Sequence, residues 1–151
     1  MSADIRTSAI NTPTSLREEL ACNQFNGQVG SQLLSETDRV RVWSVRLKPG
    51  ERIGFHRHVL DYFWTVTTAG RTRSRMADGS IIEKEYRPGD IEHYVYGSGE
   101  FKIHDLENLG DTEIVFTTVE FLDSANEPLP LHVSCVGDAR LGARRDDHER
   151  Y

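Results

Sequence analysis

Cysteine is scarce in this chain, which has only Cys22 and Cys135 among its 151 residues. These two residues lie far apart in the sequence, and two thiols do not make a disulfide scaffold. A single bridge between them stays open, although reduced thiols in a cytoplasmic protein are the simplest interpretation.

Excess positive charge and long hydrophobic runs are also missing. The chain has 18 Lys and Arg against 24 Asp and Glu, a net charge of −6, and no basic stretch interleaved with aromatic residues. We therefore expect no nucleic acid partner. No apolar run approaches membrane-spanning length, so we expect no membrane partner. The first residues, Met1 to Ile5, lack the pattern of a secretory signal, which again favours the cytoplasm.

Helical periodicity is nearly absent after residue 37, and short β-rich runs separated by turns replace it. One turn, Asp78-Gly79, lies between β-favouring runs and is a strong hairpin signal. Many short strands at this spacing predict a sandwich or a barrel. The runs cover residues 40–47, 55–58, 61–68, 71–76, 80–86, 91–96, 101–108 and 114–121.

The chain divides into three parts by composition. Residues 1–37 form an expected N-terminal arm, in which Ser15 and Glu18 have capping-box spacing and predict a short helix to about Cys22. Residues 38–122 form the expected barrel. Residues 123–151 are expected to be a C-terminal extension that is partly disordered.

Three histidines carry the clearest chemical signal. His56 and His58 form a His-x-His pair, and side chains two apart on a strand point to the same face. His104, from a later β-rich run, can complete a three-nitrogen metal site. Imidazole suits zinc, copper, iron and nickel, and three protein ligands leave positions open for water or substrate.

The strand pattern and the histidine segments together resemble the cupin family. The resemblance implies an all-β, double-stranded β-helix (a jelly-roll barrel) with a short N-terminal helical arm, and a homodimer. The stretch 55–62 looks closest to small bacterial single-domain cupins labelled with β-alanine degradation. The residues that match the two cupin motifs are Pro49-Gly50, His56, His58 and Gly70, and then Pro88-Gly89-Asp90, His104, Asn108 and Gly110-Asp111.

The sequence departs from the family where a glutamate ligand is usual, four or five residues after the second histidine. Tyr62 and Phe63 occupy those positions. Asp61, one residue earlier, points to the other face unless a bulge intervenes; if it coordinates, the site has three nitrogens and one carboxylate. The usual proline of the second motif is missing, and the loop before His104 is longer than usual.

Two further residues are candidates for catalytic roles. A phenol at Tyr62 can hydrogen-bond a metal-bound water or donate to a substrate oxygen, or Tyr62 can be an ordinary core aromatic. His93 can support the site or act as a base, although a partly exposed strand histidine is the preferred interpretation. Trp64 shares the face of Tyr62 and should line the cavity or core.

The charged side chains near these strands are expected to face outward. Arg71, Arg73 and Arg75 alternate along one run, and burying three unpaired guanidiniums would be costly. They are expected on the outside, where they can meet a subunit partner. Asp105 and Glu107 are expected to point away from the metal.

The resemblance suggests an enzyme with one divalent transition metal per chain, iron first and otherwise zinc, nickel or manganese. A three-histidine site without a firm carboxylate resembles cupin dioxygenases that act on a small chelating substrate. The alternatives are a Lewis-acid isomerase, lyase, hydrolase or cyclase, and a non-catalytic cupin that binds a small ligand. A structural barrel without metal is a further alternative.

Overall fold

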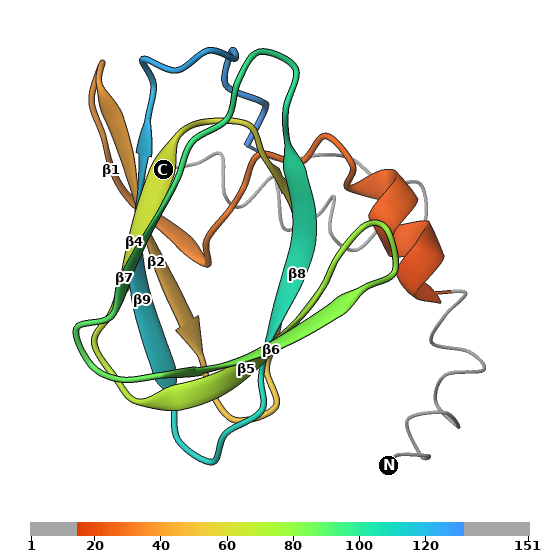
Figure 1. Ribbon diagram of the computed structural model, residues 1–151, viewed down its shortest axis with the longest axis vertical. Coiled ribbons are helices and arrows are strands. Elements are labelled where there is room, and N and C mark those ends of the chain that lie inside the picture. The colour runs from red at the N-terminus through yellow and green to blue at the C-terminus, as the bar shows by residue number, and fades with distance from the viewer. Residues whose placement is uncertain (1–14, 132–151) are drawn as a thin grey trace, which may run out of the picture.

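The computed structural model describes residues 15–131, and in this range a short helix at residues 15–22 precedes nine strands. The strands form two antiparallel sheets that enclose a common interior (Figure 1), in the orders β1-β2-β9-β4-β7 and β3-β8-β5-β6. Their bounds are β1 Gln32–Glu36, β2 Val40–Leu47, β3 Arg52–His58, β4 Tyr62–Val66, β5 Gly70–Arg75, β6 Ile81–Tyr86, β7 Ile91–Tyr94, β8 Lys102–Asn108 and β9 Ile114–Phe121.

Eight of these strands fall on the β-rich runs of the sequence, and the helix ends at Cys22 as expected. Strand β1, within the segment taken as the arm, was not predicted. Its residues are mostly exposed and it pairs only with β2, with a register shift between Leu33 and Ser35. An edge strand of this kind is stabilised by backbone hydrogen bonds to its neighbour. Because it buries little side-chain surface, its sequence shows little alternation of hydrophobic and polar residues.

The hydrophobic core lies between the sheets and is built from residues of both. Trp64, Tyr86 and Phe116 meet edge to face, with ring centroids 5.0 to 5.4 Å apart. Edge-to-face contacts of this kind add to the stabilisation from burial. The buried members of the core are Val45, Leu47, Val66, Tyr86, Ile114 and Phe116, against which Ile53, Trp64 and Leu106 pack.

A β-bulge in β3 sets the direction of its side chains. Opposite β8, Ile53 pairs with Leu106 and His56 pairs with His104, so two residues of β3 stand opposite one of β8. Without the extra residue, positions 53 and 56 would point to opposite faces. The bulge lets both side chains face the interior, where both line the same cavity.

The helix packs on the outside of the barrel, on the side of β8 (Figure 1), and is tied to the bulge by Glu19. The Glu19 carboxylate accepts two hydrogen bonds from the Arg52 guanidinium, each 2.9 Å, and one of 2.8 Å from the backbone N–H of Phe55. A Cβ at Gly54 would lie 2.6 Å from Glu19 Oε2, so any larger residue there would have to displace the Glu19 carboxylate.

The arginines of β5, and Asp105 and Glu107 of β8, face away from the histidines, as expected, and most of them form ion pairs within the chain. Arg73 pairs with Glu83, while Arg75 pairs with both Asp105 and Glu107. Asp105 is fully buried and also accepts a 2.6 Å hydrogen bond from Arg52.

Cys22 is disulfide-bonded, so the expectation of reduced thiols is wrong for this residue. The other cysteine, Cys135, lies outside the described residues, as does most of the expected C-terminal extension. Over residues 15–131, no helix is both long and apolar enough to cross a membrane. The homodimer and the cytoplasmic location stay predictions.

Candidate metal centre

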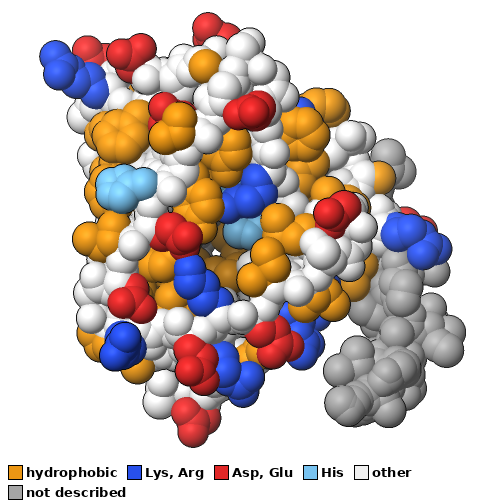
Figure 2. Space-filling model, in the orientation of Figure 1, with side chains coloured by type: hydrophobic (Ala, Val, Ile, Leu, Met, Phe, Trp, Pro, Cys, Tyr) orange, Lys and Arg blue, Asp and Glu red, His pale blue; other side chains and the backbone are white. Residues whose placement is uncertain are grey.

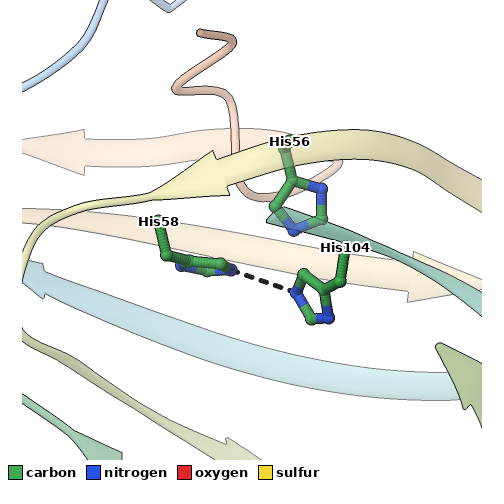
Figure 3. A group of neighbouring side chains, drawn as sticks. All are labelled: His56, His58 and His104. Atoms are coloured by element: carbon green, nitrogen blue, oxygen red, sulfur yellow. Dashed lines mark hydrogen bonds between the residues drawn. The ribbon is translucent and has the colours of Figure 1, made fainter. Parts of the chain in front are cut away.

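His56, His58 and His104 come together inside the barrel, as the spacing predicts (Figure 3). One ring nitrogen from each lies within 4.8 Å of the others, and the ring centroids are 4.7 to 5.1 Å apart. His58 Nε2 and His104 Nε2 are 3.2 Å apart. In residues 15–131, no other group of three or more His, Cys, Asp or Glu side chains is close enough to hold an ion.

The register of β3 and β8 creates this cluster. His56 stands directly opposite His104, and His58 stands opposite Lys102. Because residues two apart on a strand share a face, all four side chains project from the same side of the strand pair. The site therefore depends on the bulge that sets the register at Ile53 and His56.

Burial keeps the three imidazoles neutral. It lowers the pKa of His56 to about 4, and it lowers the pKa values of His58 and His104 well below their usual range. His56 Nδ1 lies 2.8 Å from the carbonyl oxygen of Gly54, which can only accept, so Nδ1 carries the proton. His56 Nε2 is left with a free lone pair, the arrangement common in metal-binding histidines.

These donors fit a divalent transition metal. Ligands 2.0–2.1 Å from a tetrahedral ion lie about 3.3 Å apart, and the two Nε2 atoms of His58 and His104 are 3.2 Å apart. When the two Nε2 atoms hydrogen-bond to each other, one of them carries a proton and only the other offers a lone pair. A cation between them would be coordinated by one lone pair from each histidine.

The histidines line a small cavity of about 60 Å³. Figure 2 shows a histidine at the bottom of a hollow, among hydrophobic side chains and with basic side chains beside it. Apolar side chains from both sheets make most of the wall, and no Asp or Glu of residues 15–131 belongs to it. The lining residues are Val29, Val45, Ile53, His56, His58, Tyr62, Trp64, Tyr94, Lys102, His104, Leu106, Phe116 and Thr118.

Tyr62 and Trp64 line the cavity, as alternation along β4 predicts. The Tyr62 ring stacks on His58, with centroids 4.2 Å apart, and on Tyr94 at 4.7 Å. Burial raises the pKa of Tyr62 well above its usual value. Its hydroxyl oxygen accepts a 2.7 Å hydrogen bond from Lys102 Nζ, so the phenolic proton is free to be donated elsewhere.

The structure does not bring Asp61 or His93 to the histidines. Asp61 precedes β4, its Oδ1 accepts a hydrogen bond from the backbone N–H of Tyr96, and its side chain is not part of the cavity wall. His93 is exposed on the outer face of β7, opposite Phe63. Alternation explains both positions, because Tyr62 and Tyr94, the neighbours of Asp61 and His93, point inward.

Lys102 and Tyr94 are cavity residues that the sequence reasoning missed. Lys102 lies two positions before His104 on the same strand, so alternation alone could have placed it in the site. Burial lowers the pKa of Lys102 to about 8. Tyr94 neighbours His93, the residue that drew attention instead.

Glu120 is a second buried group that was missed. It is 2 % exposed, stands opposite Tyr62 on β9, and accepts a 2.8 Å hydrogen bond from Trp43 Nε1. Burial raises its pKa to about 7. The sequence signal for Glu120 is a single glutamate inside a run of β-favouring residues, which the search for histidine ligands did not include.

Neither the known protein-family models nor the curated protein sequences contain a match to the chain. Solved structures do resemble it. A cupin domain from Bordetella pertussis Tohama I is 28 % identical, with a TM-score of 0.53, over 60 % of this chain and 88 % of that one. A conserved double-stranded β-helix protein from Klebsiella pneumoniae is 23 % identical, with a TM-score of 0.49, over 68 % of this chain and 77 % of that one.

The fold is therefore the cupin double-stranded β-helix, as predicted from the two motifs. The similarity does not extend to a branch of the family, and the link to β-alanine degradation is not confirmed.

Proposed function

We propose that the protein is a metal-dependent enzyme in which His56, His58 and His104 hold one divalent transition metal, with iron the first expectation. Its proposed activity is that of a dioxygenase on a small chelating organic substrate. The observation that carries the proposal is the cluster itself: three neutral imidazoles, two buried and one half-buried, in a cavity that no carboxylate of residues 15–131 lines.

This donor set supports an open site. Three protein ligands leave coordination positions for substrate, whereas a closed structural site uses four. Tyr62 fills the place where a glutamate ligand is usual and stacks on His58. A bound metal would supply Lewis acidity and, if redox-active, electron transfer to oxygen.

The side chains around the histidines have roles of their own. Val29, Val45 and Leu106 give the cavity an apolar wall, which limits the entry of water and strengthens polar contacts inside it. The Tyr62 hydroxyl is positioned to donate a hydrogen bond to a substrate oxygen, because its own oxygen accepts from Lys102.

Lewis-acid chemistry, as in a cupin isomerase or lyase, is the second candidate. The observation that favours it is the Lys102–Tyr62 hydrogen bond of 2.7 Å, because these reactions need a group that moves a proton.

The test begins with elemental analysis of protein purified with and without oxygen. We expect close to one transition metal ion per chain, and protein without metal under both conditions would contradict the proposal. Oxygen uptake is then measured with β-diketones, catechols and hydroxy acids. Consumption with one class supports the dioxygenase, and conversion without oxygen uptake supports the Lewis-acid candidate.

A further inference from the structure

We infer that the substrate is a small organic carboxylate and that Lys102 is the residue that selects its negative charge. The inference rests on the proposed function, since it concerns the same cavity. It names the chemical class that fits beside the three histidines.

Lys102 is placed for this role by the strand register. It stands opposite His58 and lines the cavity. Its Nζ donates to Tyr62 Oη at 2.7 Å and lies 3.8 Å from the centroid of the Tyr94 ring. An ammonium has three donors, and the Tyr62 hydroxyl takes one of them.

Lys102 has no acidic partner among the ion pairs of residues 15–131. Other partly buried cations of the barrel do: Arg52 and Arg75 share Asp105, and Lys84 pairs with Glu92. Aromatic rings on its flank attract a cation but do not neutralise it. Glu92 is the acidic group that acts on the Lys102 ammonium, but its carboxylate is paired with Lys84 and does not line the cavity. Lys102 therefore faces the cavity without an ion-pair partner of its own.

The charge of the loaded site points the same way. Three neutral imidazoles would not reduce the charge of a bound divalent ion, and the Lys102 ammonium adds a further positive charge. No acidic side chain of residues 15–131 lines the cavity, and Glu92, which acts on Lys102 from outside it, is paired with Lys84. Holding uncompensated charge in an apolar cavity is costly, so an anionic ligand is favoured over a neutral one of the same shape.

The donors of the wall favour a carboxylate over a phosphate, because a single lysine offers only a point charge. Phosphate sites commonly add an arginine fork or several backbone N–H groups, and the wall contains no arginine. A carboxylate can take one contact from Lys102 and leave its remaining oxygens for the metal or for the Tyr62 hydroxyl.

The experiment compares glycolate with glycolamide, which have nearly the same shape and differ in charge. Binding of each is measured by isothermal titration calorimetry to zinc-loaded and to metal-free protein. We expect glycolate to bind at least about tenfold more tightly than glycolamide, the factor expected for one charge-assisted hydrogen bond. Equal affinities would overturn the inference.

Variants assign the preference to Lys102. Lys102→Met should keep the zinc content of the wild type and lose most of the preference, and Lys102→Gln provides a second test if the methionine variant folds poorly. Lys48→Met, which removes an exposed lysine that does not line the cavity, is the control and should keep the preference. A Lys102 variant that keeps it would overturn the inference.

The two proposals fail in different ways. Protein that takes up no zinc contradicts the proposed function, and the comparison on metal-free protein still decides the role of Lys102. Zinc-loaded protein without a charge preference contradicts the inference alone.

Discussion

The carboxylate of Glu19 and the backbone N–H of Phe55 are joined by a 2.8 Å hydrogen bond that links the N-terminal helix to the bulge of β3. Phe55 separates His56 from Gly54, and the Gly54 carbonyl accepts from His56 Nδ1. A side chain 36 positions earlier in the chain thus holds the backbone that orients a metal-ligand candidate. Partners of this kind commonly tune metal affinity.

Gly54→Ala should destabilise the protein by about 1–3 kcal/mol, because the new Cβ would meet Glu19 Oε2 at 2.6 Å. Adding Glu19→Ala should remove the clash, so that the double variant costs less than the sum of the single ones. Urea denaturation of the four proteins measures this coupling. Additive effects would show that Glu19 does not constrain the bulge.

His58→Ala and His104→Ala should each lower metal affinity by more than the roughly 10–100-fold loss that follows removal of a ligand's hydrogen-bond partner. His93→Ala is the control, because His93 is exposed on the outer face of β7. This variant should bind metal as the wild type does. Metal content after dialysis, determined by mass spectrometry, checks this. Equal losses in all three variants would indicate general destabilisation.

Asp105→Ala should cost about 3–5 kcal/mol of stability, because it leaves Arg52 and Arg75 without their shared buried carboxylate. Glu113→Ala is the matched control: its ion pair with Arg46 is exposed, and such pairs contribute about 0–1 kcal/mol. Thermal and urea unfolding compare the two. A small loss for Asp105→Ala would mean that Glu19 and Glu107 are sufficient partners for the two arginines.

Glu120 should make the protein less stable as the pH rises from about 4.5 to about 7. Burial raises the pKa of Glu120 in the folded protein to about 7, whereas the ordinary value for an exposed glutamate is 4.5. Between these two pH values the folded state keeps a proton that the unfolded state releases. The contribution is largest below 4.5 and is lost by about pH 7, a change of about 3 kcal/mol.

Glu120→Gln isolates this effect, because glutamine still accepts from Trp43 Nε1 and does not titrate. The difference in unfolding free energy between wild type and variant should shift against the wild type between pH 5 and pH 8. A constant difference would show that Glu120 is already ionised at pH 5.

The strand runs and the two cupin motifs could be predicted from the sequence, because side-chain alternation and turn residues depend only on neighbouring positions in the chain. The same rule placed Tyr62 and Trp64 inside and the arginines of β5 outside. The bulge at Ile53 and His56 was not readable, because a register shift appears only when β8 is alongside. Glu19 was missed for the same reason: its partners, Arg52 and Phe55, are remote in sequence.

The hydrogen bond between Glu19 and the β3 bulge couples the N-terminal helix to the histidine site. Coupling between two sites is reciprocal. If the Glu19 contact to Phe55 raises ion affinity at the histidines, a bound ion must stabilise the helix by the same free energy. The helix at residues 15–22 should therefore report whether the histidines hold an ion. Its amide hydrogens should exchange more slowly when an ion is bound.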